Sequence, residues 1–287
     1  MTAVFFAWHG NSWTENTLSR WDWGKRPIHI LVALPFLQGY ERQSVNYGAP
    51  LSPLSTILDS GAFSAWKSGM KIDIDDLIAR SRSGYWDECV ALDVIGDSEG
   101  SVKNALYMKQ QGATVIPVFH YGEDWGVLRD YCAEFGRVGL SCRFGEPEKE
   151  SLRWVDQCFS RAWPHLFHSF GWVSPRTLVA VPFDTADASS WQQGPTAFGS
   201  WYAFDGKKIG LRCNKDNPAV VLDSEIEKCH EMQQRLEELW ARDLHDLRLA
   251  TLGESLTRRR TLSTSFPGEV GASWSRFSAA SSRLTAP

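Results

Sequence analysis

The chain has 287 residues, of which 43% are hydrophobic, and it carries a formal net charge of −4. This composition is typical of a globular protein, and the charge excludes a general electrostatic attraction to nucleic acid, so any phosphate contact must come from local groups. The six cysteines are scattered without a Cys-x-x-Cys pair, which favours free thiols in a cytoplasmic protein. The sequence has no apolar run long enough to cross a bilayer,.

The N-terminal part of the chain opens with an aromatic and polar stretch, residues 1–27, which has little periodicity and is expected to be irregular. An apolar run at 28–34 predicts a first strand, and 37–54 has the composition of a loop,. The next strand, 56–59, ends at a carboxylate and is followed by a glycine that permits a tight turn,.

Apolar strands then alternate with amphipathic helices along the chain. Further strands are predicted at 89–93, 114–120, 137–141, 165–170 and 208–213. Helices are predicted at 71–81, 98–111, 125–135 and 148–162. A repeat of about 25–30 residues implies a parallel sheet with crossover helices. Roughly seven or eight candidate strands favour an α/β fold of the (β/α)8, TIM-like barrel type over an open sheet.

The expected organisation is a single catalytic barrel over residues 1–250, with a long amphipathic helix at 223–247. Residues 251–287 are rich in Ser, Thr, Gly and Ala and are expected to be disordered,. The run Arg258–Arg260 in this tail is interpreted as a solvated feature, with a phosphate-contacting arm as the alternative,.

Polar side chains recur where the predicted strands stop, at Asp59, Asp93, His120 and Asp187. A barrel gathers such positions at one face, so a polar pocket is expected there. Several carboxylates in one pocket suit acid–base catalysis or covalent attack on a sugar carbon. Two alternatives stay open: each Asp caps a turn or helix, or the cluster binds a divalent cation.

Six short motifs follow one another along these strand ends: Asp59–Ser64 (DSGAFS), Ala91–Asp93 (ALD), Val118–Gly122 (VFHYG), Val138–Glu146 (VGLSCRFGE), Phe170–Pro175 (FGWVSP) and Asp184–Asp187 (DTAD). In this order they resemble motifs of the tRNA-guanine transglycosylases, over about residues 28–215. The particular variants are most similar to the bacteriophage branch, which inserts 7-deazaguanine bases into DNA.

The resemblance implies a DNA guanine transglycosylase that exchanges guanine for a preQ0-like 7-deazaguanine through a covalent Asp–sugar intermediate. Its partners would be DNA, free guanine and the free deazaguanine base, and it would act in the cytoplasm of a bacterial host if encoded by a phage. The alternatives are a tRNA-guanine transglycosylase and a metal-dependent barrel hydrolase.

The resemblance also implies roles for individual residues. Asp187 would be the nucleophile, with Asp184 as the alternative, and Asp59 the general acid/base. Asp93 would accept hydrogen bonds from the base, and His120 would contact its carbonyl oxygen. The other implied substrate-binding residues are Ser60, Gly61, Phe63, Gly139, Leu140 and Gly171. Candidate nucleic-acid contacts, each with an ordinary surface or packing role as the alternative, are Lys67, Arg143, Arg176 and Trp191.

No cofactor is expected. The zinc motif of the tRNA enzymes, C-x-C-x-x-C with a later His, is not evident, because this chain offers only Cys213, Cys229 and late histidines such as His230 in the corresponding region. Zinc stays an alternative implied by the resemblance, but the sequence assigns no metal ligand.

Overall fold

The computed structural model describes residues 3–8, 28–46, 53–142, 148–171, 178, 181–189, 200–204, 209–213 and 234. The strands of the main sheet are β1 (Ala3–Trp8), β2 (His29–Ala33), β3 (Thr56–Asp59), β4 (Glu88–Val90), β5 (Val115–Ile116), β6 (Val118–His120), β7 (Arg137–Ser141), β8 (Leu166–Ser169) and β9 (Thr185–Ala188). The helices are the short 3-10 helix η1 (Leu34–Phe36), α2 (Leu37–Asn46), α3 (Ala62–Ser68), α4 (Ile74–Ser81), α5 (Ser98–Gln110), α6 (Trp125–Glu134) and α7 (Glu148–Ala162).

The main sheet confirms the predicted α/β, TIM-like barrel class. Its nine strands are hydrogen-bonded in the order β5-β4-β3-β2-β1-β9-β8-β7-β6. The strand predicted at 114–120 is divided into β5 and β6 by Pro117, which has no N–H for a sheet hydrogen bond,. β5 and β6 stand at opposite ends of the strand order, although only Pro117 separates them in the sequence. The two together therefore correspond to one strand of an eight-stranded barrel, which accounts for the nine labelled strands,.

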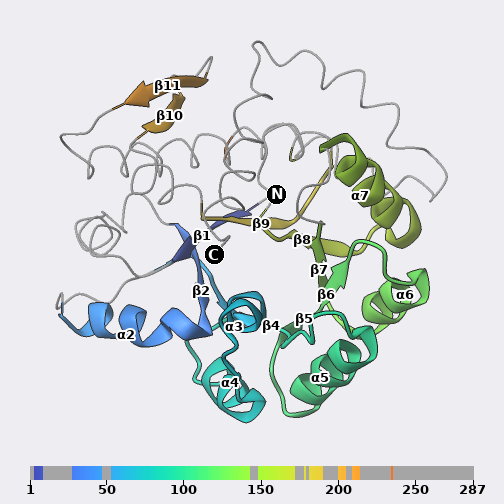
Figure 1. The fold of residues 1–287 in the computed structure, drawn as a ribbon, viewed down its shortest axis with the longest axis horizontal. Helices are drawn as coiled ribbons and strands as arrows, with labels where there is room; N and C mark the ends of the chain where they lie inside the picture. Colours follow the sequence, from blue (N-terminus) through green and yellow to red (C-terminus); the bar gives the residue numbers. More distant parts are fainter. Residues whose placement is uncertain are drawn as a thin grey trace. The chain divides into compact units, whose positions relative to one another are not determined.

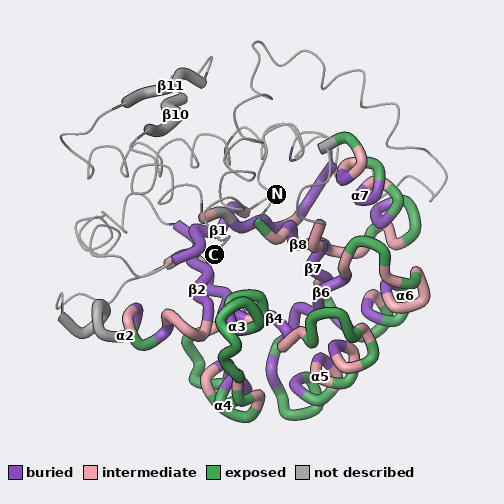
Figure 2. Tube along the Cα trace, in the orientation of Figure 1, coloured by how far each residue is buried: buried purple, intermediate pink, exposed green. Residues whose placement is uncertain are grey.

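The chain divides into two compact units. The N-terminal unit comprises Phe5–Gly139, and the C-terminal unit comprises Met1–Val4 with Leu140–Pro287. In the N-terminal unit, α4, α5 and α6 lie on the outer side of the strands (Figure 1). The strands are buried, whereas the helices bury one face only (Figure 2).

The pairing register of the N-terminal unit fixes which side chains face away from the helices. Trp8 packs edge-on against Tyr40 of α2, with ring centroids 5.6 Å apart, so it faces the helix layer. Trp8 pairs with Val32, and Val32 pairs with Leu58. Because side chains alternate along a strand, Asp59 points to the opposite face, the interior of the sheet.

In the C-terminal unit, α7 packs on β8 through Phe159, whose ring centroid lies 4.8 Å from that of Phe167. His168, the next residue of β8, therefore faces away from α7. It pairs in parallel with Thr185 of β9. A separate antiparallel pair of strands, β10 (Ser200–Phe204) and β11 (Ile209–Cys213), completes the described part of this unit.

Two of the predictions for the N-terminal part are wrong, and one helix was missed. Residues 3–8 form a strand and not an irregular segment, because their apolar run is buried from Val4 to Trp8. The expected loop begins with helix α2, which buries Leu37 and Tyr40, one helical turn apart. Helix α3 was not predicted, since it is short and lies between two glycines with left-handed backbone, Gly61 and Gly69.

Of the predictions for the C-terminal part, one strand is found and the others lie largely outside the described residues. The strand predicted at 208–213 exists as β11, but it pairs with β10 and does not extend the main sheet. Apart from Gln234, the predicted helix at 223–247 and the tail at 251–287 lie outside the described residues, and so does the run Arg258–Arg260. The single catalytic domain over 1–250 stays a prediction.

Gly61 offers a test of the turn that follows Asp59. Its φ is +72°, and a Cβ there would lie 2.4 Å from Cδ of Pro35. We expect Gly61→Ala to lower the free energy of unfolding by about 2–4 kcal/mol, through left-handed strain and overpacking together. Urea unfolding followed by circular dichroism measures this loss.

Gly84→Ala is the matched control, because Gly84 also has a positive φ, +84°, but a Cβ there meets nothing within 4 Å. It should cost only the backbone strain, about 1–2 kcal/mol. Equal losses in the two variants would show that the contact with Pro35 does not constrain the turn.

Candidate active site

The N-terminal unit carries three acidic residues and one histidine at the ends of its strands or just after them. Asp59 is the last residue of β3, and its Oδ1 accepts a hydrogen bond from the backbone N–H of Gly61 at 3.3 Å. This bond supports the turn, as the capping alternative predicted. It does not exclude a second role, because the side chain is only partly buried and faces the sheet interior.

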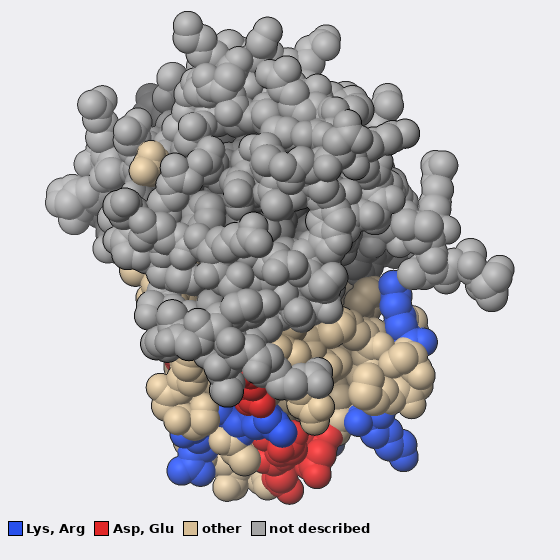
Figure 3. Space-filling model, turned by 90° about the vertical axis from the view of Figure 1, so that its left-hand side faces the viewer, with Lys and Arg blue, Asp and Glu red and all other residues tan. Residues whose placement is uncertain are grey.

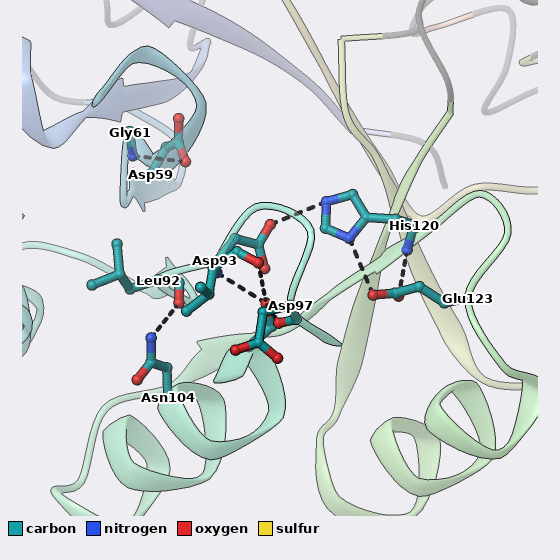
Figure 4. A network of polar contacts seen from close by, with 10 residues as sticks. Asp59, Gly61, Leu92, Asp93, Asp97, Asn104, His120 and Glu123 are labelled. Atoms are coloured by element: carbon teal, nitrogen blue, oxygen red, sulfur yellow. Dashed lines mark hydrogen bonds and ion pairs between the residues drawn. The ribbon is translucent and has the colours of Figure 1, made fainter. Parts of the chain in front are cut away.

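Asp93, His120 and Glu123 form a hydrogen-bonded group, here called the acidic trio (Figure 4). Nε2 of His120 lies 3.2 Å from Oδ2 of Asp93, and Nδ1 lies 3.7 Å from Oε1 of Glu123. The backbone N–H of His120 also donates to Oε2 of Glu123 at 2.8 Å. His120 is therefore held on both sides by carboxylates.

The loop that carries Asp93 is fixed by side chains of α5. Asn104 donates from Nδ2 to the carbonyl of Leu92 at 2.9 Å (Figure 4). The hydroxyl of Ser101 accepts a hydrogen bond from the backbone N–H of Val94 at 2.9 Å. These bonds anchor the backbone on both sides of Asp93, so its carboxylate is placed by tertiary contacts and not by the strand, which ends at Val90.

The charges of the acidic trio depend on one another. Burial alone would lower the pKa of His120, but hydrogen bonds to Asp93 and Glu123 outweigh it and raise the pKa to about 10. Burial would raise the pKa of Glu123, yet its bonds to His120 lower it. Burial raises the pKa of Asp93 in spite of His120. At neutral pH His120 is thus an imidazolium ion with both N–H groups directed at carboxylates.

One oxygen of the acidic trio has no hydrogen-bond partner among the described residues. Oδ1 of Asp93 is buried, and no described residue gives it a hydrogen bond. The whole side chain is 9% exposed. An unsatisfied buried acceptor costs roughly 1–3 kcal/mol or more, so native proteins keep few of them. This oxygen is the strongest indication of a ligand in the N-terminal unit.

The C-terminal unit holds a second arrangement around Asp187. Its Oδ1 accepts a hydrogen bond from the backbone N–H of Gly171 at 2.8 Å and lies 3.3 Å from Nε2 of His168. Nδ1 of His168 lies 2.7 Å from the hydroxyl of Thr185. His168 is fully buried, and Asp187 is 8% exposed. Asp184, by contrast, accepts the backbone N–H of Phe167 at 2.9 Å.

The structure brings together some of the predicted site residues. Asp93 and His120 are in direct contact in the N-terminal unit, and Asp59 belongs to the same unit. Asp187 and Gly171 are in contact in the C-terminal unit. Arg143, Arg176 and Trp191 lie outside the described residues. No observation tests the binding roles assigned to any of these residues, which stay predictions.

The other predicted residues are placed as follows. Ser60 is buried, and Gly139 and Leu140 lie in the buried middle of β7. Phe63 of α3 is 39% exposed, and Nζ of Lys67 lies 4.4 Å from its ring centroid. The charge of Lys67 therefore rests over an aromatic face.

Glu123, His168 and its partner Thr185 were not predicted as site residues from the sequence. Glu123 follows His120 by three residues in the turn before α6, a spacing that would have allowed the contact to be proposed. His168 lies inside a predicted strand, and nothing in the sequence tells which face of that strand is the interior. Its partner Asp187 is 19 residues away, and strand pairing alone brings them together.

The described ranges contain no group of three or more His, Cys, Asp or Glu side chains able to hold a metal ion. Cys229 and His230 lie outside those ranges. No helix in the described part of the chain is long and apolar enough to cross a membrane.

Surface charge shows no preference for one sign on the face in Figure 3, where acidic and basic side chains lie next to one another in the described part. Helix α4 illustrates such mixing, since Arg80 forms ion pairs with both Asp76 and Glu41.

Comparison with known proteins reveals likeness of fold alone. No protein-family model and no curated protein matches the chain. A solved chain of the tryptophan synthase complex from Pyrococcus furiosus matches with a TM-score of 0.51 and 9% identity, covering 81% of this chain and 98% of that one. The tryptophan synthase alpha chain from Legionella pneumophila matches with a TM-score of 0.51 and 10% identity, covering 83% and 92%.

These matches overturn the resemblance to tRNA-guanine transglycosylases, which is a wrong prediction. The matching structures are tryptophan synthase alpha subunits, and no family model supports the short motifs. Guanine exchange in DNA or tRNA, the phage branch, and DNA and 7-deazaguanine as partners are withdrawn with it. The motifs misled because strand ends followed by Gly turns recur in any parallel barrel, so their order follows from the fold.

The imidazolium of His120 generates a prediction on stability. Its folded pKa of about 10 lies above its ordinary value of 6.5. The protonated form therefore stabilises the folded state fully below pH 6.5, and this contribution is lost as the pH rises toward 10. We expect the stability advantage of the wild type over His120→Gln to shrink across that window in urea unfolding at several pH values. A constant difference between pH 6 and 10 would contradict the assignment of an imidazolium.

Proposed function

We propose that this chain is an enzyme that performs general acid–base catalysis on a small polar molecule, with Asp93 as the group that accepts a proton or a hydrogen bond from it. The observation that carries the proposal is the buried Oδ1 of Asp93, which no described residue satisfies while Oδ2 is held by His120. A ligand that carries an N–H or O–H group is the partner that such an oxygen requires.

The chemistry of the acidic trio supports a base rather than an acid at this position. Both N–H groups of His120 are directed at carboxylates, so its role is electrostatic: its charge favours the ionised form of Asp93 against burial,. Burial in turn raises the pKa of Asp93 toward the working pH, where a general base is most effective,. Glu123 lies on the other side of the imidazolium, with its Oε1 3.7 Å from Nδ1 of His120.

The fold supports the position of this site. Asp93 and His120 follow β4 and end β6, and the C-terminal ends of strands are where TIM barrels build their active sites,. Asp59 lies at the end of β3 on the interior face and is proposed as the second carboxylate. The likeness to tryptophan synthase alpha subunits supplies the fold and no substrate, so the substrate class is inferred from Asp93 alone.

The proposal is tested by incubating the purified chain with an extract of polar metabolites and following time-dependent depletion by mass spectrometry. We expect the wild type to convert at least one compound, and Asp93→Asn to slow that conversion by about 10²-fold or more, as removal of a general base does. Asp75→Asn, a change at an exposed carboxylate of α4, is the matched control and should leave the rate unchanged.

Two outcomes would refute the proposed function. The first is a wild type that converts no compound beyond a heat-denatured sample. The second is an Asp93→Asn variant that converts the same compounds at the wild-type rate.

A pH profile of kcat/KM on a compound found in this way tests the role of His120. Loss of the imidazolium charge in His120→Gln should raise the pKa of Asp93 further, because a nearby cation favours the carboxylate. The ascending limb of the profile should therefore move to higher pH in His120→Gln. A limb that stays in place would show that His120 does not act on the base.

A further inference from the structure

The arrangement around Asp187 in the C-terminal unit is not used by the acidic trio or by the proposed function. It consists of the hydroxyl of Thr185, the imidazole of His168 and the carboxylate of Asp187, with the backbone N–H of Gly171 as a further donor. Thr185 and His168 are neighbours by strand pairing, and Asp187 follows Thr185 on the same face of β9,. The three side chains form one line of hydrogen bonds.

The direction of these hydrogen bonds follows from the groups involved. An ionised carboxylate accepts hydrogen bonds only, so Nε2 of His168 must donate to Oδ1 of Asp187,. In the tautomer that carries its hydrogen on Nε2, the ring has a lone pair on Nδ1 that can accept the hydroxyl hydrogen of Thr185,. The line therefore runs from Thr185 through His168 to Asp187, and the carboxylate of Asp187 selects the tautomer, because the hydroxyl of Thr185 can either donate or accept,.

The two carboxylate oxygens of Asp187 differ in their hydrogen bonds. Oδ1 receives the hydrogen bonds from His168 and Gly171. Oδ2 receives none from the described residues, and the side chain retains 12% exposure. Asp184 shows the contrast, because its carboxylate binds the backbone N–H of Phe167 and so joins β8 to the start of β9.

We propose that His168 is a positioning residue that holds Asp187 with its Oδ2 oxygen presented to a ligand carrying a cationic or N–H group, which gives the C-terminal unit a carboxylate site of its own. A buried imidazole is a costly way to supply one hydrogen bond. Its advantage is rigidity: the ring is fixed at both nitrogens, so it fixes the orientation of the carboxylate plane.

The first test is nitrogen NMR of histidine-labelled protein, which distinguishes the two neutral tautomers. We expect His168 to carry its hydrogen on Nε2 in the wild type. Asp187→Ala removes the acceptor of Nε2–H and should give a mixture of tautomers, whereas Thr185→Ser, which keeps the hydroxyl, should keep the wild-type spectrum,. Wild-type His168 with its hydrogen on Nδ1 would overturn the proposal.

The second test uses methylammonium as the probe, titrated while the Nε2 resonance of His168 is followed. A saturable shift is expected in the wild type and in Thr185→Ser. Asp187→Asn should lose it, and Thr185→Val should bind about three- to tenfold more weakly, the effect of one hydrogen bond of about 1 kcal/mol. His165→Gln is the control, since His165 contacts the ring of Phe167 and should leave both readouts unchanged.

Absence of a saturable shift in the wild type, or an unchanged shift in Asp187→Asn, would overturn the proposal. Neither test depends on Asp93, so this inference and the proposed function can fail independently. Circular dichroism of each variant confirms that it is folded before the readouts are compared.

Discussion

The imidazolium of His120 between two carboxylates is the interaction on which the rest of the site depends. Burying two carboxylates side by side is unfavourable unless a cation lies between them. His120 supplies that cation, and in return the carboxylates hold its pKa near 10. Oδ1 of Asp93 takes no part in this interaction and has no hydrogen-bond donor among the described residues. A purely structural group would satisfy both oxygens, so the surplus acceptor gives the site its proposed function.

The fold explains how these groups meet. Asp59 and His120 each end a parallel strand, and Asp93 follows one, so the sheet delivers three polar residues from distant parts of the sequence to one end of the N-terminal unit. The alternation of side chains adds the second condition, since Asp59 faces the interior only because its neighbour Leu58 faces the helices,. Glu123 lies in the short turn after β6. Its Oε2 accepts a hydrogen bond from the backbone N–H of His120, which stabilises this turn.

Much of the fold could be predicted from the sequence, and the misses have physical causes. Strands and helices between Thr56 and Ala162 follow their hydrophobic periodicity closely,. The strand at residues 3–8 was missed because its short apolar run lies in an aromatic and polar stretch, residues 1–27, that has little periodicity as a whole. Helix α3 was missed because seven residues between two glycines give too short a pattern. The functional assignment failed for another reason: short motifs at strand ends follow from the barrel itself and do not identify a chemistry.

The sequence by itself determined the α/β barrel class and the polar residues at the strand ends, because periodicity and strand termination are local properties of the chain. Only the tertiary structure decided that Asp93 and His120 touch, that Glu123 and His168 join the sites, and that Asp187 and Asp184 have different partners. These facts depend on strand register and on pairing between segments up to 27 residues apart in the sequence. Charge, burial and hydrogen-bond direction are set by such contacts, and local sequence does not encode them.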